Sequence, residues 1–226
     1  MIQENLAHVR ERIAIACAGS GRSENEVKLV AVSKFKPVSD IEEAIGAGQT
    51  VFGENRVQEL CDKYQILGQK VEWHLIGHLQ RNKVKYIIDK AAMIHSVDSI
   101  RLAEQISAEA VKAGVIMPVL LEVNVAREES KFGFFIEEAE EAVRKMGMMP
   151  GLKVKGLMTI APFVEDAEEN RKYFKKLYEL YVDIRSKNID NIEMVDLSMG
   201  MTGDYEVAIE EGATMVRVGT GIFGSR

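Results

Sequence analysis

Pro118-Val-Leu-Leu-Glu-Val-Asn-Val125 is the clearest strand-like stretch of the chain, apolar at nearly every position. A strand that is apolar on both faces is typical of a parallel sheet covered by helices. A helical segment, 136–146, follows it, and the same alternation of strand and helix extends in both directions. The other expected strands are 27–33, 50–55, 71–76, 93–97, 154–160, 192–197 and 214–218. The other expected helices are 2–18, 39–47, 56–67, 81–90, 99–113, 167–187 and 204–211.

Eight strands and seven intervening helices, after one leading helix, predict an α/β protein of the TIM-barrel class. A (β/α)8 barrel commonly occupies 200–250 residues as one unit, and this chain has 226. We therefore expect residues 1–226 to form a single domain with an extra N-terminal helix. In such barrels the functional site lies at the carboxyl ends of the strands.

The composition narrows the class of partner. Lys and Arg number 29 against 35 Asp and Glu, and the charges are interspersed, which argues against nucleic acid. The chain has no apolar stretch of the roughly 20 residues that span a bilayer, and its first residues do not resemble a signal peptide. Cys17 and Cys61 lack metal-ligand spacing. These features predict a cytoplasmic protein with reduced thiols and no membrane or nucleic-acid partner.

The strand ends carry polar residues suited to a phosphorylated cofactor. Lys34 directly follows the first strand, where an amine facing the barrel mouth can form a Schiff base; the competing interpretation is a lysine extending to solvent. Lys36 is a nearby alternative, although it precedes Pro37 and belongs to the loop. A lysine together with two phosphate-type loops points toward pyridoxal 5′-phosphate (PLP).

The two loops follow the last two strands. Leu197-Ser-Met-Gly-Met-Thr-Gly203 and Gly219-Thr-Gly221 offer hydroxyls and unhindered N–H groups, and phosphate sites of TIM barrels commonly form at these strands. The alternative is that the glycines only make tight turns. Arg217, inside the last strand, could donate to a pyridine nitrogen if it faces inward. His74 and His78 are four residues apart, but nothing completes a metal site with them.

Six segments, in order, resemble the pyridoxal phosphate homeostasis protein family. That family is similar to the N-terminal barrel of alanine racemase and of ornithine decarboxylase, the fold-type III PLP proteins. The segments are Ala31-Val-Ser-Lys34, Phe52-Gly-Glu-Asn-Arg56, Trp73-His-Leu-Ile-Gly-His-Leu-Gln80, Gly156-Leu-Met-Thr159, Leu197-Ser-Met-Gly-Met201 and Val216-Arg-Val-Gly-Thr220.

The resemblance implies a PLP-binding barrel in which Lys34 carries the cofactor as an internal aldimine. It also implies that Arg217 contacts the pyridine nitrogen. The phosphate would be held by Ser198, Gly219 and Thr220, and the pocket would be lined by Asn55, His74 and Met201.

The resemblance further implies a non-enzymatic protein of vitamin B6 homeostasis that binds PLP, with PLP-dependent apoenzymes as possible recipients. Related racemases add a C-terminal domain and a second acid/base, which we do not expect here, so we expect a monomeric barrel with one proton-transfer group. The first alternative is a small amino-acid racemase or decarboxylase. The second is a TIM-barrel enzyme that acts on a sugar phosphate.

Overall fold

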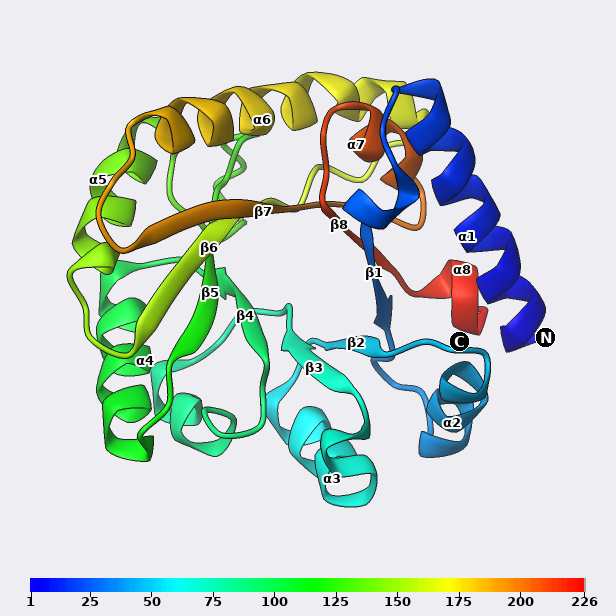
Figure 1. The fold of residues 1–226 in the computed structure, drawn as a ribbon, viewed down its shortest axis with the longest axis horizontal. Coiled ribbons are helices and arrows are strands. Elements are labelled where there is room, and N and C mark those ends of the chain that lie inside the picture. Colours follow the sequence, from blue (N-terminus) through cyan, green and yellow to red (C-terminus); the bar gives the residue numbers. More distant parts are fainter. Residues whose placement is uncertain (226) are drawn as a thin grey trace.

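The computed structural model describes residues 1–225 and contains a closed barrel of eight parallel strands (Figure 1). Neighbouring strands pair in sequence order, and β8 pairs with β1, with Lys28 opposite Met215, to close the ring. The predicted (β/α)8 architecture with its leading helix is confirmed. The strands are β1 (Lys28–Val32), β2 (Val51–Glu54), β3 (Glu72–Leu75), β4 (Met93–Val97), β5 (Met117–Glu122), β6 (Leu152–Met158), β7 (Ile192–Met201) and β8 (Met215–Val218).

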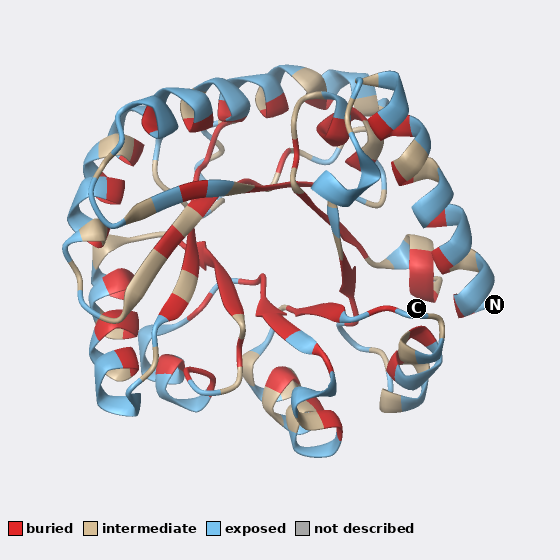
Figure 2. Ribbon diagram, viewed as in Figure 1, coloured by how far each residue is buried: buried red, intermediate tan, exposed pale blue. Residues whose placement is uncertain are grey.

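Helices surround the barrel, and their buried residues face the strands while their outer faces are exposed (Figure 2). The leading helix packs beside the short helix that follows β8, so the first and last described elements are neighbours (Figure 1). The α-helices are α1 (Ile2–Gly19), α2 (Val38–Gly46), α3 (Val57–Leu67), α4 (Ile100–Ala113), α5 (Ile136–Gly147), α6 (Arg171–Ser186), α7 (Tyr205–Glu210) and α8 (Thr220–Phe223). Four short 3-10 helices are η1 (Glu24–Glu26), η2 (Gly68–Lys70), η3 (Arg81–Tyr86) and η4 (Ala167–Asn170).

Local sequence explains where the helices stop and start. Helix α4 begins after Ser99, whose hydroxyl accepts a hydrogen bond from the N–H of Leu102. It ends at Gly114, which adopts a left-handed conformation with φ of 68°, where a side chain would be strained. Both signals are readable in the sequence, and helix 99–113 was predicted with nearly these bounds.

Strand residues alternate between the helical shell and the barrel interior, as parallel strands require. Trp73 and Leu75 belong to the main apolar cluster under the helices, whereas His74 between them does not. A small separate cluster made by Met93, Leu120, Met158 and Met215 fills the interior. Several remaining interior positions carry polar side chains, and these form hydrogen bonds with one another in the centre of the barrel.

Two predicted boundaries were wrong. The segment expected as helix 81–90 forms only the 3-10 helix η3, in which Val84 buries its side chain, and the residue that ends it, Ile87, is buried as well. Three-residue spacing satisfies a 3-10 turn as well as an α-helix, so the apolar pattern does not separate them. The expected loop at 197–203 continues β7 as far as Met201, which places Ser198 within a strand.

Candidate functional site

Lys34 lies in the turn after β1 and is exposed. Within residues 1–225 its amine has no hydrogen bond or ion pair. The neighbouring alternative is occupied: Lys36 Nζ donates to the carbonyl oxygens of Phe223 at 2.9 Å and of Ser225 at 3.3 Å. The structure thus distinguishes the two lysines, because only Lys34 offers a free amine at this strand end.

The turn that carries Lys34 is anchored from below by a buried ion pair. Lys63 on α3 donates to Glu54 Oε1 and to the carbonyl oxygen of Ser33, each at 2.7 Å. The hydroxyl of Ser33 also donates to Glu54, at 2.5 Å. Burial raises the pKa of Glu54, and the charge of Lys63 opposes that shift. Glu59 accepts from Lys63 and from the N–H of Phe35, which fixes the residue after Lys34.

Arg217 on β8 points into the barrel, where it is 3% exposed. Its Nη1 donates to Ser198 Oγ at 2.5 Å, and its Nη2 donates to the carbonyl oxygen of Thr159 at 2.8 Å. Burial lowers the pKa of Arg217 to about 10, so the side chain remains charged at neutral pH. These two bonds use two of the five N–H donors of a guanidinium, which leaves three for a bound group.

Ser198 and His74 lie in the interior below this arginine. Ser198 is fully buried, and its hydroxyl lies between Arg217 and His95 Nδ1, 3.0 Å away. Its side chain is therefore engaged at a point where the resemblance implied a phosphate ligand. His74 is buried on β3 and reaches Ser198 only through His95, because His74 Nδ1 lies 2.8 Å from His95 Nε2.

The two predicted phosphate loops do meet. The hydroxyl of Thr202 accepts hydrogen bonds from the N–H of Gly219 at 3.2 Å and of Gly221 at 3.4 Å. Gly219 also abuts the end of β1, since a Cβ there would lie 3.3 Å from the carbonyl oxygen of Val32. Thr220 is exposed beside it. The loop after β8 therefore lies next to the strand that leads to Lys34.

Met201 and Asn55 complete the predicted set. Met201 is 39% exposed at the end of β7, and its N–H donates to Asp204 Oδ1 at 2.7 Å. Asn55 follows β2, and its buried Oδ1 has no hydrogen-bond partner among the described residues. Gly77 permits the next strand end to lie against it, because a Cβ at Gly77 would be 2.4 Å from the Asn55 carbonyl oxygen. An unpaired buried acceptor is costly, which suits a residue awaiting a ligand.

Sequence reasoning missed Glu122, at the carboxyl end of β5. This carboxyl is 6% exposed. Burial, together with the negative charge of Asp98, raises its pKa to about 7, although Arg217 opposes the shift. Asp98 in turn lies 2.8 Å from His78 Nδ1. The signal was present, since Glu122 is the one charged residue inside the apolar run 118–125.

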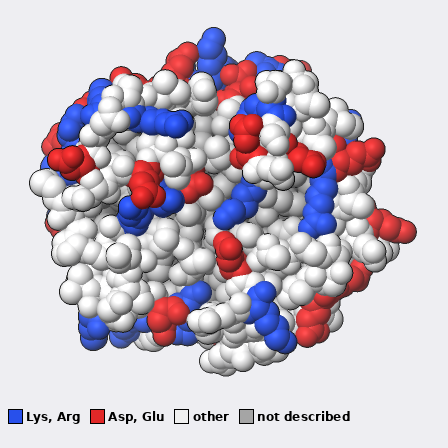
Figure 3. All heavy atoms as spheres, viewed as in Figure 1, with Lys and Arg blue, Asp and Glu red and all other residues white. Residues whose placement is uncertain are grey.

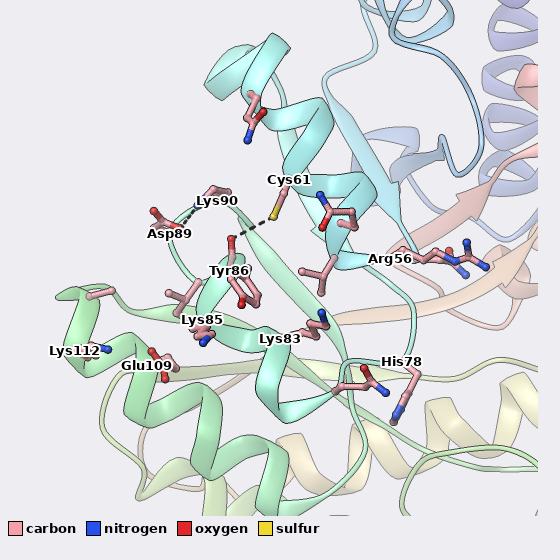
Figure 4. Close-up of a pocket in the computed structure, with 17 residues that line it drawn as sticks. Arg56, Cys61, His78, Lys83, Lys85, Tyr86, Asp89, Lys90, Glu109 and Lys112 are labelled. Atoms are coloured by element: carbon pink, nitrogen blue, oxygen red, sulfur yellow. Dashed lines mark hydrogen bonds and ion pairs between the residues drawn. The ribbon is translucent and has the colours of Figure 1, made fainter.

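A large cleft lies outside the mouth, between α3, η3 and α4 (Figure 4). It measures about 1200 Å³ and touches the mouth only at its rim, through Asn55, Arg56 and His78. In Figure 4, Cys61 points toward the carbonyl of Tyr86, at 3.4 Å. Neither Lys34 nor Arg217 lines this cleft. Its basic lining residues are Arg56, Lys83, Lys85, Lys90 and Lys112, and its acidic ones are Asp89 and Glu109.

Comparison with known proteins identifies the family. The family model described as "Alanine racemase, N-terminal domain" matches residues 4–226. The pyridoxal phosphate homeostasis protein of Aquifex aeolicus is 47% identical over 224 residues, covering 99% of this chain and 97% of that protein. This chain belongs to the pyridoxal phosphate homeostasis protein family. The Escherichia coli K12 member is 38% identical over 231 residues, covering 100% of this chain and 97% of its own length. The resemblance inferred from six segments is confirmed.

Solved structures agree with this assignment to the pyridoxal phosphate homeostasis proteins. PipY of Synechococcus elongatus PCC7942, solved with PLP bound, is 33% identical with a TM-score of 0.86, covering 99% of this chain and all of PipY. The alanine racemase of Clostridium difficile 630 is 15% identical with a TM-score of 0.75, covering all of this chain and 56% of the racemase. That second likeness shows the shared barrel fold.

Proposed function

We propose that this protein binds PLP at the barrel mouth and serves PLP homeostasis without catalysing a reaction of its own. The observation that carries the proposal is the free amine of Lys34 beside the loop after β8, with the buried guanidinium of Arg217 on the adjacent strand. Members of its family are named for this role, and one is solved with PLP bound.

The residues present fit the cofactor. PLP supplies an aldehyde carbon to which a lysine amine adds with loss of water, and Lys34 offers the amine. Arg217 is charged at neutral pH and can only donate, so it would hold a ring nitrogen unprotonated. Gly219 and Thr220 would bind the phosphate through N–H groups and a hydroxyl. The side-chain carbonyl of Asn55 and the side chain of Met201 would line the pocket. Ser198 would support Arg217 directly, and His74 would do so through His95.

The test uses Lys34→Ala beside Lys36→Ala, two residues apart on the same turn. Each purified protein is mixed with PLP, reduced with borohydride and digested, and the peptides are weighed by mass spectrometry. We expect wild type and Lys36→Ala to carry one cofactor mass on Lys34, and Lys34→Ala to carry none in that peptide. A wild type that ignores PLP, or modification centred on Lys36, would overturn the assignment.

Glu122 is the residue that supports the alternative function, an amino-acid racemase or decarboxylase. A carboxyl with a pKa of about 7 in the mouth can exchange protons at neutral pH. The PLP-loaded protein is incubated with each amino acid in D₂O, while the Cα–H signal and CO₂ release are followed. We expect no turnover; steady exchange that Glu122→Gln abolishes would establish the enzyme instead.

The finer parts of the proposal concern location and partners. We propose a cytoplasmic, monomeric protein, one domain over residues 1–226, that supplies PLP to PLP-dependent apoenzymes and binds no nucleic acid. Charges of both signs are interspersed on the face in Figure 3, without a basic stripe. None of the helices in residues 1–225 is long and apolar enough to cross a membrane. Light scattering would test the monomer, and activation of an apoenzyme by the loaded protein would test delivery.

A further inference from the structure

A continuous chain of polar side chains crosses the barrel interior. It joins His74 on β3, His95 on β4, Ser198 on β7 and Arg217 on β8, all at most 3% exposed. The successive contacts are 2.8 Å between the two imidazoles, 3.0 Å from His95 to Ser198, and 2.5 Å from Ser198 to Arg217. His95 was not among the predicted site residues, yet it is the central link.

Arg217 fixes the direction of the first bond, and the tautomers of the two histidines fix the other two. Arg217 can only donate, so the oxygen of Ser198 accepts from it, and the second lone pair of that oxygen leaves both directions open toward His95 Nδ1. Glu72 selects between them, because its carboxylate lies 3.8 Å from His74 Nε2 and favours a proton on that nitrogen. A neutral His74 then has a bare Nδ1 that accepts from His95 Nε2–H, and the bare Nδ1 of His95 accepts from the hydroxyl of Ser198. The opposite order would turn a lone pair of His74 toward the carboxylate, which electrostatics disfavours.

Both imidazoles have the charge state that this order requires. Burial lowers the pKa of His74, although Glu72 favours its charged form. Burial lowers the pKa of His95 further, and the positive charges of Arg217 and Lys28 add to that effect. Each ring is thus neutral at pH 7 and has a single N–H.

The lower end of the chain is an anion. Glu72 Oε2 lies 3.8 Å from His74 Nε2, which is too long for a hydrogen bond, so the carboxylate acts electrostatically. This contact is the main reason why the pKa of Glu72 falls to about 2. A carboxylate at the N-terminal face of the barrel is therefore connected to a guanidinium near its mouth by neutral groups.

We propose that His95 and His74 are positioning residues for Arg217. They hold the hydroxyl of Ser198 as an acceptor, and together with the carbonyl oxygen of Thr159 this gives the planar guanidinium two fixed points. Its remaining N–H groups are thereby directed from a rigid base. That Arg217 serves a cofactor ring rests on the proposed function, whereas the proton order does not.

The proton order is tested on the protein without PLP. Long-range ¹H–¹⁵N NMR resolves the tautomer of each of the four histidines, assigned by single substitutions. We expect His74 and His95 to remain in the Nε2–H form from pH 7 to 8. Ser198→Ala should abolish the fixed tautomer of His95. The control Ser96→Ala should not, because Ser96 lies on the same strand as His95 but outside the chain of hydrogen-bonded side chains. A charged ring, or His95 with its proton on Nδ1, would overturn the proposal.

The positioning role is tested with two amides at position 95. In His95→Asn the amide oxygen takes the place of Nδ1 and can still accept from Ser198. In His95→Gln the amide lies at the place of Nε2, and the acceptor for Ser198 is lost. We expect His95→Asn to bind PLP within about twofold of wild type and His95→Gln about tenfold more weakly, which is the effect of one hydrogen bond. The absorbance of the bound cofactor should shift only in His95→Gln.

The possible results are separable. Equal weakening in both variants, with unshifted absorbance, would mean that the chain only fills the barrel, and the proposal fails. A wild type that binds no PLP would refute the proposed function, while the NMR result would still decide the proton order. If a variant does not fold, the wild-type tautomers alone can overturn the proposal.

Discussion

Glu122 is a buried residue whose ionisation affects the stability of the folded protein. Its pKa is about 7 in the fold against 4.5 for an ordinary glutamate, so the folded protein binds this proton more tightly than the unfolded chain. Stability from this group is full below pH 4.5 and is lost as the pH rises toward 7. The difference corresponds to about 3 kcal/mol.

We expect Glu122→Gln, which cannot ionise, to avoid that loss. The free energy of unfolding of the variant minus that of wild type should be about 3 kcal/mol larger at pH 8 than at pH 4.5, which means that the variant gains stability relative to wild type. Urea unfolding at both values measures it, with Glu129→Gln as the exposed control. A pH-independent difference would show that the carboxyl is already ionised without cost.

At the residue scale, the sequence locates candidates only where a strand end gives them a place. Lys34 was preferred to Lys36 on position and stays a prediction; the structure adds that the amine of Lys36 is hydrogen-bonded. The sequence alone left the orientation of Arg217 open, because an inward or outward position depends on strand parity. Glu122 points to the same side of β5 as Leu120, and Ser198 points to the same side of the sheet as Arg217. Which side is the barrel interior is fixed only by the pairing of neighbouring strands in the folded sheet.

At the scale of elements, the backbone of β7 lies directly against Gly156 of β6. A Cβ there would lie 1.6 Å from the carbonyl oxygen of Asp196, and φ is +156°. We expect Gly156→Ala to prevent soluble folding or to cost more than about 4 kcal/mol. Gly46→Ala, in a helix with open space around it, should be neutral or stabilising by up to about 1 kcal/mol. Soluble expression and urea midpoints compare the two, and similar midpoints would contradict the expectation.

The ion pair between Lys63 and Glu54 connects α3 to the ends of β1 and β2. Lys63→Met should destabilise the fold by about 3–5 kcal/mol, because it leaves a buried carboxylate unpaired. Adding Glu54→Leu should recover most of that loss, and the exposed control Lys70→Met should change little. The unfolding free energies of the four proteins form the measurement; a single variant as stable as wild type would mean that Glu54 is protonated without cost.

Elements with strong periodicity and clear ends were predictable, as α4 with its Ser99 cap and Gly114 stop illustrates. The pattern failed where two structures share a spacing, as in η3, and where glycine was taken as a loop signal, as at Gly200 in β7. At Gly200 the neighbouring strand decides the outcome, since pairing with β8 extends β7 to Met201. Such tertiary effects cannot be read from the sequence of a single segment.

At the scale of the whole molecule, cofactor binding and unfolding are linked. A ligand bound only by the folded protein adds about 2.7 kcal/mol at one hundred times its Kd, and for a chain of this size that raises Tm by about 5–10 °C. We expect this shift for wild type with PLP and a clearly smaller one for Lys34→Ala, by scanning calorimetry. Equal shifts in the two proteins would place the binding energy elsewhere.

The pairing of β8 with β1 has a consequence for folding during synthesis on the ribosome. During synthesis Lys34 emerges early, whereas the loop that abuts its strand is made almost two hundred residues later. Until β8 inserts, β1 and β7 both expose unpaired backbone edges, which favour aggregation. The side chain of Asn5 then donates to the carbonyl of Ile222, and Lys36 to that of Phe223, so the earliest and latest segments fasten together. A ribosome-bound chain that lacks this last strand should therefore depend on chaperones and should bind no PLP.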